Sequence, residues 1–177
     1  MSDLFEMLLY EAVNSKTEVP VLLSIDGAAM IYGDVDGSQQ CYPFSPPRYT
    51  RLLNASLVDI QHPAEDASLR VPRPPVSSAV SLSGGPNRRW LVTLGATIFT
   101  GEEVSWDQWL DYNSCTNGGR WEADIVSALK QGYPTGADER AYFHLINVRF
   151  HNTQTATNLG GPIYVPTGEI ACLGSQR

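Results

Sequence analysis

The sequence predicts a mainly β protein of the α+β class, with two small, pseudo-symmetric antiparallel barrels in tandem. An N-terminal helix and a helical insertion in the second barrel complete the predicted fold. Three observations indicate it. GAAMIYG (27–33) returns as GATIFTG (95–101), short apolar strands alternate with turns rich in glycine and proline, and helical spacing of apolar residues is confined to two segments.

The first expected element is an amphipathic helix over residues 2–15, SDLFEMLLYEAVNS. Ser2 can accept hydrogen bonds from free amides of the first turn, and Asp3 and Glu6 suit the positive end of the helix dipole. One apolar stripe consists of Phe5, Leu8, Leu9, Ala12 and Val13. We expect this stripe to pack on the elements that follow.

The first barrel is expected to contain four extended segments, at residues 21–25, 29–32, 51–60 and 69–82. A tight turn at Asp26-Gly27 joins the first two, and residues 36–48 form a loop. The last segment is extended because its prolines forbid a helix. Residues 83–89, SGGPNRR, are the best linker candidate and separate the expected domains 1–84 and 89–177.

The second half is expected to repeat this order, with a strand, a glycine turn and a strand at residues 90–104 and further strands at 141–150 and 163–173. Two helices lie between the first two of these strands and form the insertion at 105–131. Ser105 and Gln108 make a capping box for the first helix. The second helix carries an apolar stripe that includes Trp121 and Ile125, and it ends at Gly132.

Aligning the two halves gives pairs of equivalent residues. Gly27 matches Gly95, Gly33 matches Gly101, Asn54 matches Asn147, and Pro72 matches Pro166. A glycine permits a tight turn or a sharp bend in a strand, and a proline suits a strand end where no amide is needed. These residues therefore have structural roles in strongly bent barrels. The alternative is that the glycines mark two hairpins of one α+β sheet. The expected core contains Leu23, Ile25, Ile31, Leu53, Leu57, Val92, Ile98, Leu145, Val148 and Ile170.

Charge and composition narrow the possible functions. The net charge is −7 and neither half is basic, so we expect no binding to nucleic acid. No apolar run is long enough to span a bilayer. The chain has three cysteines, an odd number without a CxxC motif, and its start is acidic where a signal peptide would be basic. We therefore expect free thiols and a cytoplasmic protein that does not act at membranes.

The motifs of this chain resemble those of the Sm-like and SH3-like small barrels. The order is a helix, a strand pair with two glycines, a strand with LLNA (52–55), and a closing VPxxxI. The second half also resembles the gas-vesicle accessory protein U family, in TLGATIFTGEEVSWDQWL (93–110) and in residues 142–175, which begin YFHLINVRFHN and close with GPIYVPTGEIACLGS. The resemblance implies a non-enzymatic accessory or assembly protein without catalytic residues. The Asp…Asn pair of RNA-binding Sm-like proteins is absent here.

No catalytic, metal or cofactor site is predicted. His144 and His151 are seven residues apart and face opposite sides of a regular strand. His62 lacks a third metal ligand, and the stretch from Asp34 does not match the calcium loop of an EF-hand. Cys115 is interpreted as an exposed loop thiol.

Aromatic residues make the insertion the preferred binding surface, because aromatic anchors are common at interface centres. Packing in the core against the barrel is the default for such aromatic residues. The interface candidates are nevertheless Trp106, Trp109, Leu110, Tyr112 and Trp121, because the insertion distinguishes the second copy. The first functional hypothesis is thus non-catalytic binding or assembly through another protein or a second copy of the chain. The alternative is a small-ligand-binding domain or an enzyme, with a pocket between the copies lined by Tyr142, His144, Trp106 and Trp109.

Overall fold

The computed structural model of the chain describes ten stretches. They are residues 4–25, 29–40, 47–57, 67–73, 78–84, 87–95, 97–132, 139–151, 157–159 and 161–177. Five residues named in the sequence analysis lie outside them, namely Ser2, Asp3, Asp26, Gly27 and His62, and so does Cys41, one of the three cysteines.

The described chain is mainly β with a small helical layer. The helices are α1 (Leu4–Ser15), α2 (Trp106–Asn113) and α3 (Ala123–Gly132), with short turns η2 (Cys115–Asn117) and η3 (Thr167–Glu169). The strands are β1 (Val19–Ile25), β2 (Ala29–Val35), β3 (Tyr49–Leu57), β4 (Ala67–Pro72), β5 (Ala79–Ser81), β6 (Arg89–Leu94), β7 (Thr97–Glu103), β8 (Tyr142–Phe150), β9 (Thr157–Asn158), β10 (Ile163–Pro166) and β11 (Ile170–Gln176). The N-terminal helix and the helical insertion are confirmed.

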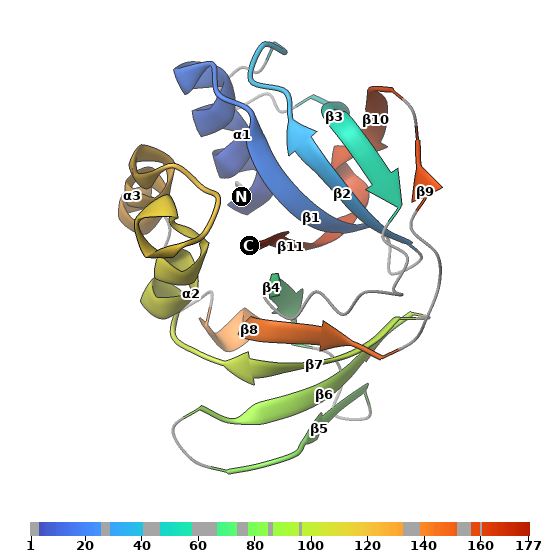
Figure 1. Cartoon of the computed structure of the whole chain (residues 1–177), viewed down its shortest axis with the longest axis vertical. Helices are drawn as coiled ribbons and strands as arrows, with labels where there is room; N and C mark the ends of the chain where they lie inside the picture. The colour runs from blue at the N-terminus through green and yellow to red at the C-terminus, as the bar shows by residue number, and fades with distance from the viewer. Residues whose placement is uncertain are drawn as a thin grey trace.

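One antiparallel sheet runs through the molecule (Figure 1). Its strand order is β10-β3-β2-β1-β11-β4-β8-β7-β6-β5, and β9 pairs with β3 beside this path. The terminal strands β10 and β5 do not pair with each other, so the sheet is not closed. Two closed barrels in tandem are therefore not confirmed; the β content and the antiparallel pairing are.

The two halves of the sequence exchange strands within this sheet. β4 and β5, from the first half, pair with β8 and β6 of the second. β10 and β11, from the second half, pair with β3 and β1 of the first. The sheet therefore consists of a first five-stranded set, β10-β3-β2-β1-β11, and a second, β4-β8-β7-β6-β5. The pairing of β11 with β4 joins the two sets, and Figure 1 shows both strands in the middle of the molecule. Each set is thus completed by strands from the other half.

Corresponding strands keep corresponding registers. Tyr32 pairs with Ser56 between β2 and β3, and Thr100 pairs with Arg149 between β7 and β8. The first members of these pairs are 68 residues apart and the second members are 93 apart. The remaining pairs of the two ladders follow the same shifts. The ladders β10·β3 and β4·β8 correspond in the same way.

Both ladders are irregular at the same place. The register shifts beside Gly33 in β2 and beside Gly101 in β7. A Cβ atom at Gly33 would lie 3.1 Å from Leu52 Cβ, and one at Gly101 would lie 3.0 Å from Leu145 Cβ. The two glycines therefore let the next strand approach closely at the bend.

The three helices lie along one side of the molecule, with α1 next to β1 and α2 against β4 and β8 (Figure 1). One core cluster joins the buried faces of α1, α2 and α3 to β1 and β2, and a second cluster fills the space between β4, β7 and β8. The apolar face of α1 explains why this helix packs against the sheet. Its buried residues are Leu4, Phe5, Leu8, Leu9 and Ala12. The amphipathic stripe read from the sequence is the contact surface.

The core prediction is correct for half of the residues. Leu23, Ile31, Val92, Leu145 and Val148 are buried, whereas Ile25, Leu53 and Ile170 are partly buried. The prediction is wrong for Leu57 and Ile98, whose side chains are 36% and 37% exposed. In β3 the alternation changes phase at Asn54, whose φ is 51°. Leu52 and Ala55 face the core as a result.

Candidate functional site

The tryptophans of the insertion form the inner wall of the helical layer. Trp106, Trp109 and Trp121 are fully buried, as is Leu110. The ring centroids of Trp109 and Trp121 are 5.6 Å apart with planes at 82°, and those of Trp106 and Trp109 are 5.9 Å apart and stacked. These side chains are core, so they are not an exposed binding surface in this structure.

Local signals place this cluster. Ser105 and Gln108 form the predicted capping box at the start of α2, which directs Trp106 and Trp109 inward. The indole Nε1 of Trp121 donates to the carbonyl oxygen of Pro20 at 2.7 Å. Tyr112 is the one interface candidate that is half-buried, and its hydroxyl donates to Asn147 Oδ1 at 3.3 Å.

The predicted pocket between the copies is filled by the same packing. His144 is 1% exposed, and its ring centroid lies 5.4 Å from that of Trp106 and 5.7 Å from that of Trp109. Tyr142 is half-buried and carries the guanidinium of Arg70 3.4 Å above its ring. The rings of His144, Trp106 and Trp109 thus contact one another where a ligand was expected.

A buried polar cluster, not foreseen from the sequence, joins α2 to the middle of the sheet. The hydroxyls of Ser68 on β4 and Ser175 on β11 both donate to Asn113 Oδ1 at 2.6 Å. Asn113 Nδ2 donates to the carbonyl oxygen of Trp109 at 2.8 Å. All of these side chains are buried and satisfied, so the cluster fixes the β11·β4 contact and is not a reactive site.

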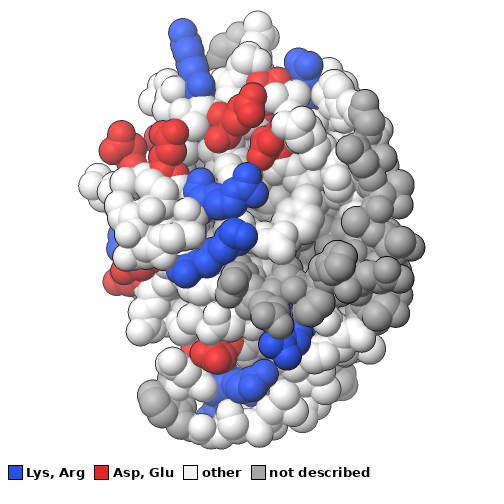
Figure 2. All heavy atoms as spheres, in the orientation of Figure 1, with Lys and Arg blue, Asp and Glu red and all other residues white. Residues whose placement is uncertain are grey.

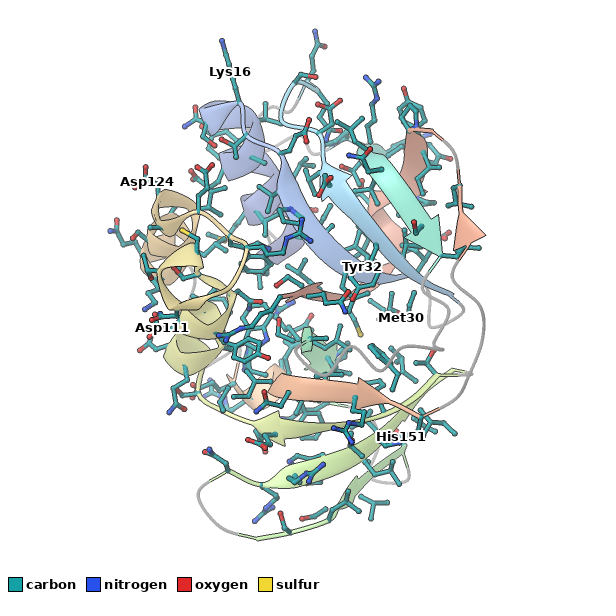
Figure 3. All side chains as sticks on the ribbon, viewed as in Figure 1. Lys16, Met30, Tyr32, Asp111, Asp124 and His151 are labelled. Atoms are coloured by element: carbon teal, nitrogen blue, oxygen red, sulfur yellow. The ribbon has the colours of Figure 1, made fainter. Side chains whose placement is uncertain are left out.

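A half-open hollow of about 250 Å³ lies on the face of the first five-stranded set. It is lined by Pro20, Val21, Tyr32, Gly33, Asp34, Asn54, Arg120 and Gln176. Figure 3 shows Tyr32 on β2 near the centre of the molecule, close to Met30. Residues from three neighbouring strands, from the segment before α3 and from β11 therefore meet here.

The polar groups of the hollow are incompletely satisfied. The Tyr32 hydroxyl is buried and has no hydrogen-bond partner in the part of the chain that the structure describes. Burial raises the pKa of this hydroxyl, and the positive charge of Arg120 opposes that rise. Asn54 Nδ2 donates to Asp34 Oδ2 at 3.1 Å. The hollow thus contains one orphaned donor and a carboxylate held by an amide.

Charges of both signs line the hollow without neutralising each other. Among the described residues no ion pair joins Arg120 to Asp34. Figure 2 shows basic atoms near the middle of the viewed face and acidic atoms above them. A cation and an anion that line one small space and do not form an ion pair with each other can orient a polar molecule.

The other titratable groups do not assemble into a metal site. No cluster of three or more potential metal ligands occurs in the described stretches. His144 is buried, whereas His151 is exposed, and its Nε2 atom lies 2.9 Å from Thr100 Oγ1. Cys115 is exposed and Cys172 is buried, and burial raises the pKa of the Cys172 thiol to about 12.

The two ends of the sheet expose apolar side chains. Among described large hydrophobic residues, four are more than half exposed. They are Tyr49 (56%), Tyr164 (66%), Val80 (54%) and Leu82 (51%). The first two belong to the β3·β10 end, and the last two to β5 and the residues that follow it. These positions were not chosen from the sequence, where the aromatic insertion was the stronger signal.

Comparisons with protein-family models, curated proteins and solved structures found no match for this chain. Within the described residues, none of the helices has the length and apolar character that crossing a membrane requires. Functional inference therefore depends on the sheet ends and the hollow.

Proposed function

We propose that this chain is a non-catalytic binding and assembly protein that associates with a second copy or another protein through the ends of its sheet. The observation that carries the proposal is the position of the exposed apolar residues. Among the described large hydrophobic residues that are more than half exposed, Tyr164 and Val80 lie on the strands that end the sheet, β10 and β5. Tyr49 on β3 pairs with Pro166 of β10, and Leu82 directly follows β5. Unpaired edge strands present free N–H and C=O groups to another strand.

The chain itself provides an example of such pairing. β11 and β4 come from different halves and pair along Leu173–Arg70 to Gln176–Ala67. We regard the two halves as products of a duplication, which is supported by the equal registers around Gly33 and Gly101. The resemblance to small Sm-like and SH3-like barrels and to the gas-vesicle accessory family agrees with an assembly role.

The internal contact cannot be repeated unchanged between copies. Val80 on β5 pairs with Leu91 of β6, and Gly174 on β11 pairs with Leu22 of β1. Val80 is therefore the residue of β5 that corresponds to Gly174 in the other strand set. A Cβ atom at Gly174 would overlap the backbone of Ser68. Association at β5 therefore uses a different register. Two β5 edges paired around a twofold axis would bury Val80 and Leu82 of both copies and close the assembly.

Sedimentation velocity over a wide concentration range tests this function. The wild type is expected to self-associate, and Val80→Lys is expected to shift it to the monomer, because a lysine on an edge strand blocks pairing. Tyr10→Lys is the matched control, since Tyr10 is exposed on α1 away from the edges. A wild type that stays monomeric throughout, or a Tyr10→Lys effect equal to that of Val80→Lys, would contradict self-association through β5.

Small-ligand binding is the second candidate, and a specific observation favours it. Tyr32 lines an open hollow, and its buried hydroxyl has no hydrogen-bond partner among the residues that the structure describes. Nucleic acid is the least favoured partner because the net charge is −7. We assign no residue a catalytic role and expect the protein to act in the cytoplasm.

A further inference from the structure

We propose that the hollow beside Tyr32 binds a small zwitterion of the α-amino acid type, with its carboxylate at Arg120 and Tyr32 and its ammonium group at Asp34. This inference is independent of the sheet ends, because the hollow lies on the face of β1, β2 and β3. It assigns a ligand class to a site whose two charged residues form no ion pair within the described stretches.

The carboxylate end is defined by two donors. A buried hydroxyl without a partner loses its hydrogen bonds to water, at a cost of about 1–3 kcal/mol. The Tyr32 hydroxyl is such a group among the described residues, and the charge of Arg120 reaches it. A ligand carboxylate can accept from both, and hydrogen bonds to a charged acceptor are the stronger kind. Binding of the ligand carboxylate would give the Tyr32 hydroxyl a hydrogen-bond acceptor.

The ammonium end is defined by Asp34. Its Oδ2 atom accepts from Asn54 Nδ2, which holds the carboxylate in place. A carboxylate accepts several hydrogen bonds, so Asp34 retains capacity for a ligand ammonium group. Asn147, the counterpart of Asn54, instead accepts a hydrogen bond from Tyr112 of α2. The first five-stranded set presents Asn54 to the hollow, whereas Asn147 contacts α2.

The size and charge of the hollow restrict the ligand further. A volume of about 250 Å³ is below the range of pockets for drug-sized molecules, so the ligand is small. Asp34 repels a simple anion and Arg120 repels a simple cation. A molecule with both charges gains from both residues, and Gln176 adds an amide at the rim.

NMR titration of the full chain tests the proposal. The probes are a panel of α-amino acids, with acetate and methylamine as ligands that carry one charge each. We expect amino acids to shift the amide signals of Tyr32, Asp34 and Asn54, and acetate and methylamine to bind at least about tenfold more weakly, because each loses one charge-assisted contact.

Three substitutions test the assigned contacts: Arg120→Gln, Asp34→Asn and Tyr32→Phe. Each should weaken amino-acid binding about tenfold or more. Without ligand, Tyr32→Phe should unfold at the wild-type temperature or above, because it removes an unsatisfied buried hydroxyl. Arg89→Gln and Tyr164→Phe are the matched controls, exposed and outside the hollow, and should bind like the wild type.

The proposal is overturned if no amino acid in the panel shifts these signals at about 10 mM, far above the concentrations that specific sites require. It is also overturned if acetate binds as tightly as the amino acids, since that result would indicate an anion site only. Equal losses in the control variants would place binding elsewhere on the molecule.

Discussion

Asn54 and Asn147 have the same left-handed backbone conformation, with φ angles of 51° and 49°. They lie at corresponding positions of β3 and β8, inside the two register shifts, where two residues of β3 or β8 lie opposite the single residue Gly33 or Gly101. Asparagine tolerates this conformation better than other residues with side chains, apart from aspartate and histidine. The two asparagines therefore mark the point at which each strand bends and changes the phase of its buried residues.

Replacing Asn147 tests the backbone role of this position. Asn147→Val should destabilise the protein by about 1–3 kcal/mol more than Asn147→Gly, because a β-branched residue is strained at positive φ. Both variants lose the hydrogen bond from Tyr112, so their difference isolates the backbone term. Urea denaturation measures it. Equal midpoints for the two variants would show that the left-handed conformation carries no cost.

Gly174→Ala tests the contact between the two strand sets. The added Cβ atom would overlap the carbonyl oxygen of Ser68, so β11 and β4 would have to separate. We expect a loss of at least about 2 kcal/mol, as for other changes that force backbone movement in a packed core. Gly168→Ala is the control, because its Cβ atom would meet open space. Calorimetric unfolding temperatures similar for both variants would be incompatible with this junction.

Trp109→Ala tests the role of the tryptophan cluster as core. Trp109 packs against Trp106, Trp121 and His144 and is fully buried. Its truncation should cost about 3–5 kcal/mol through lost burial and a cavity. Tyr164→Ala, in contrast, should change stability by less than about 0.5 kcal/mol, as is usual at the surface. If guanidinium denaturation gives Trp109→Ala the wild-type stability, the helical layer is not part of the core.

The carboxyl group of Asp36 should make the free energy of unfolding depend on pH in the acidic range. Hydrogen bonds from the Ser38 hydroxyl and amide, together with Arg51, hold the pKa of its carboxyl below the usual range, despite its burial. The folded state thus binds the proton more weakly than the unfolded state, whose pKa is about 3.9. The stabilisation is complete above that pKa and is lost as pH falls through the folded-state value.

Unfolding midpoints between about pH 6 and pH 2 measure this dependence. Asp36→Asn should be less stable than the wild type at neutral pH and should lose less stability on acidification. Glu122→Gln is an exposed control that should keep the wild-type slope. An unchanged slope in Asp36→Asn would refute the assignment.

Local features were predictable because they depend on near neighbours. The α1 stripe and the capping box of Ser105 and Gln108 follow from spacing alone, and both are present. The repeated glycines and asparagines likewise indicated equivalent positions, and Gly33 and Gly101 have the same surroundings. The pairing of β4 with β8 was not predictable, because either half contains all the strands of a barrel and no local pattern states which copy each strand completes.

The candidate sites show the same limit. The tryptophans read equally well as interface anchors or as core, and only their packing against Pro20 and His144 decides for the core. The hollow brings Tyr32, Asp34 and Asn54 together with Arg120, which is far away in the sequence. In the sequence, Arg120 is a single charged residue in the segment before a helix, and this pattern does not indicate that it lines a hollow. Val80 and Leu82 are equally inconspicuous, because their exposure depends on β5 ending the sheet.

The exchange of strands between the halves is the central claim, and separate expression of residues 1–84 and 85–177 tests it most directly. Each fragment alone lacks the strands that complete its sheet, so neither should give the dispersed NMR spectrum of a folded monomer. Mixed together, the fragments should form a one-to-one complex with the spectrum of the intact chain. If either fragment alone folds cooperatively as a monomer, the halves are independent tandem domains and the exchange of β4, β5, β10 and β11 is contradicted.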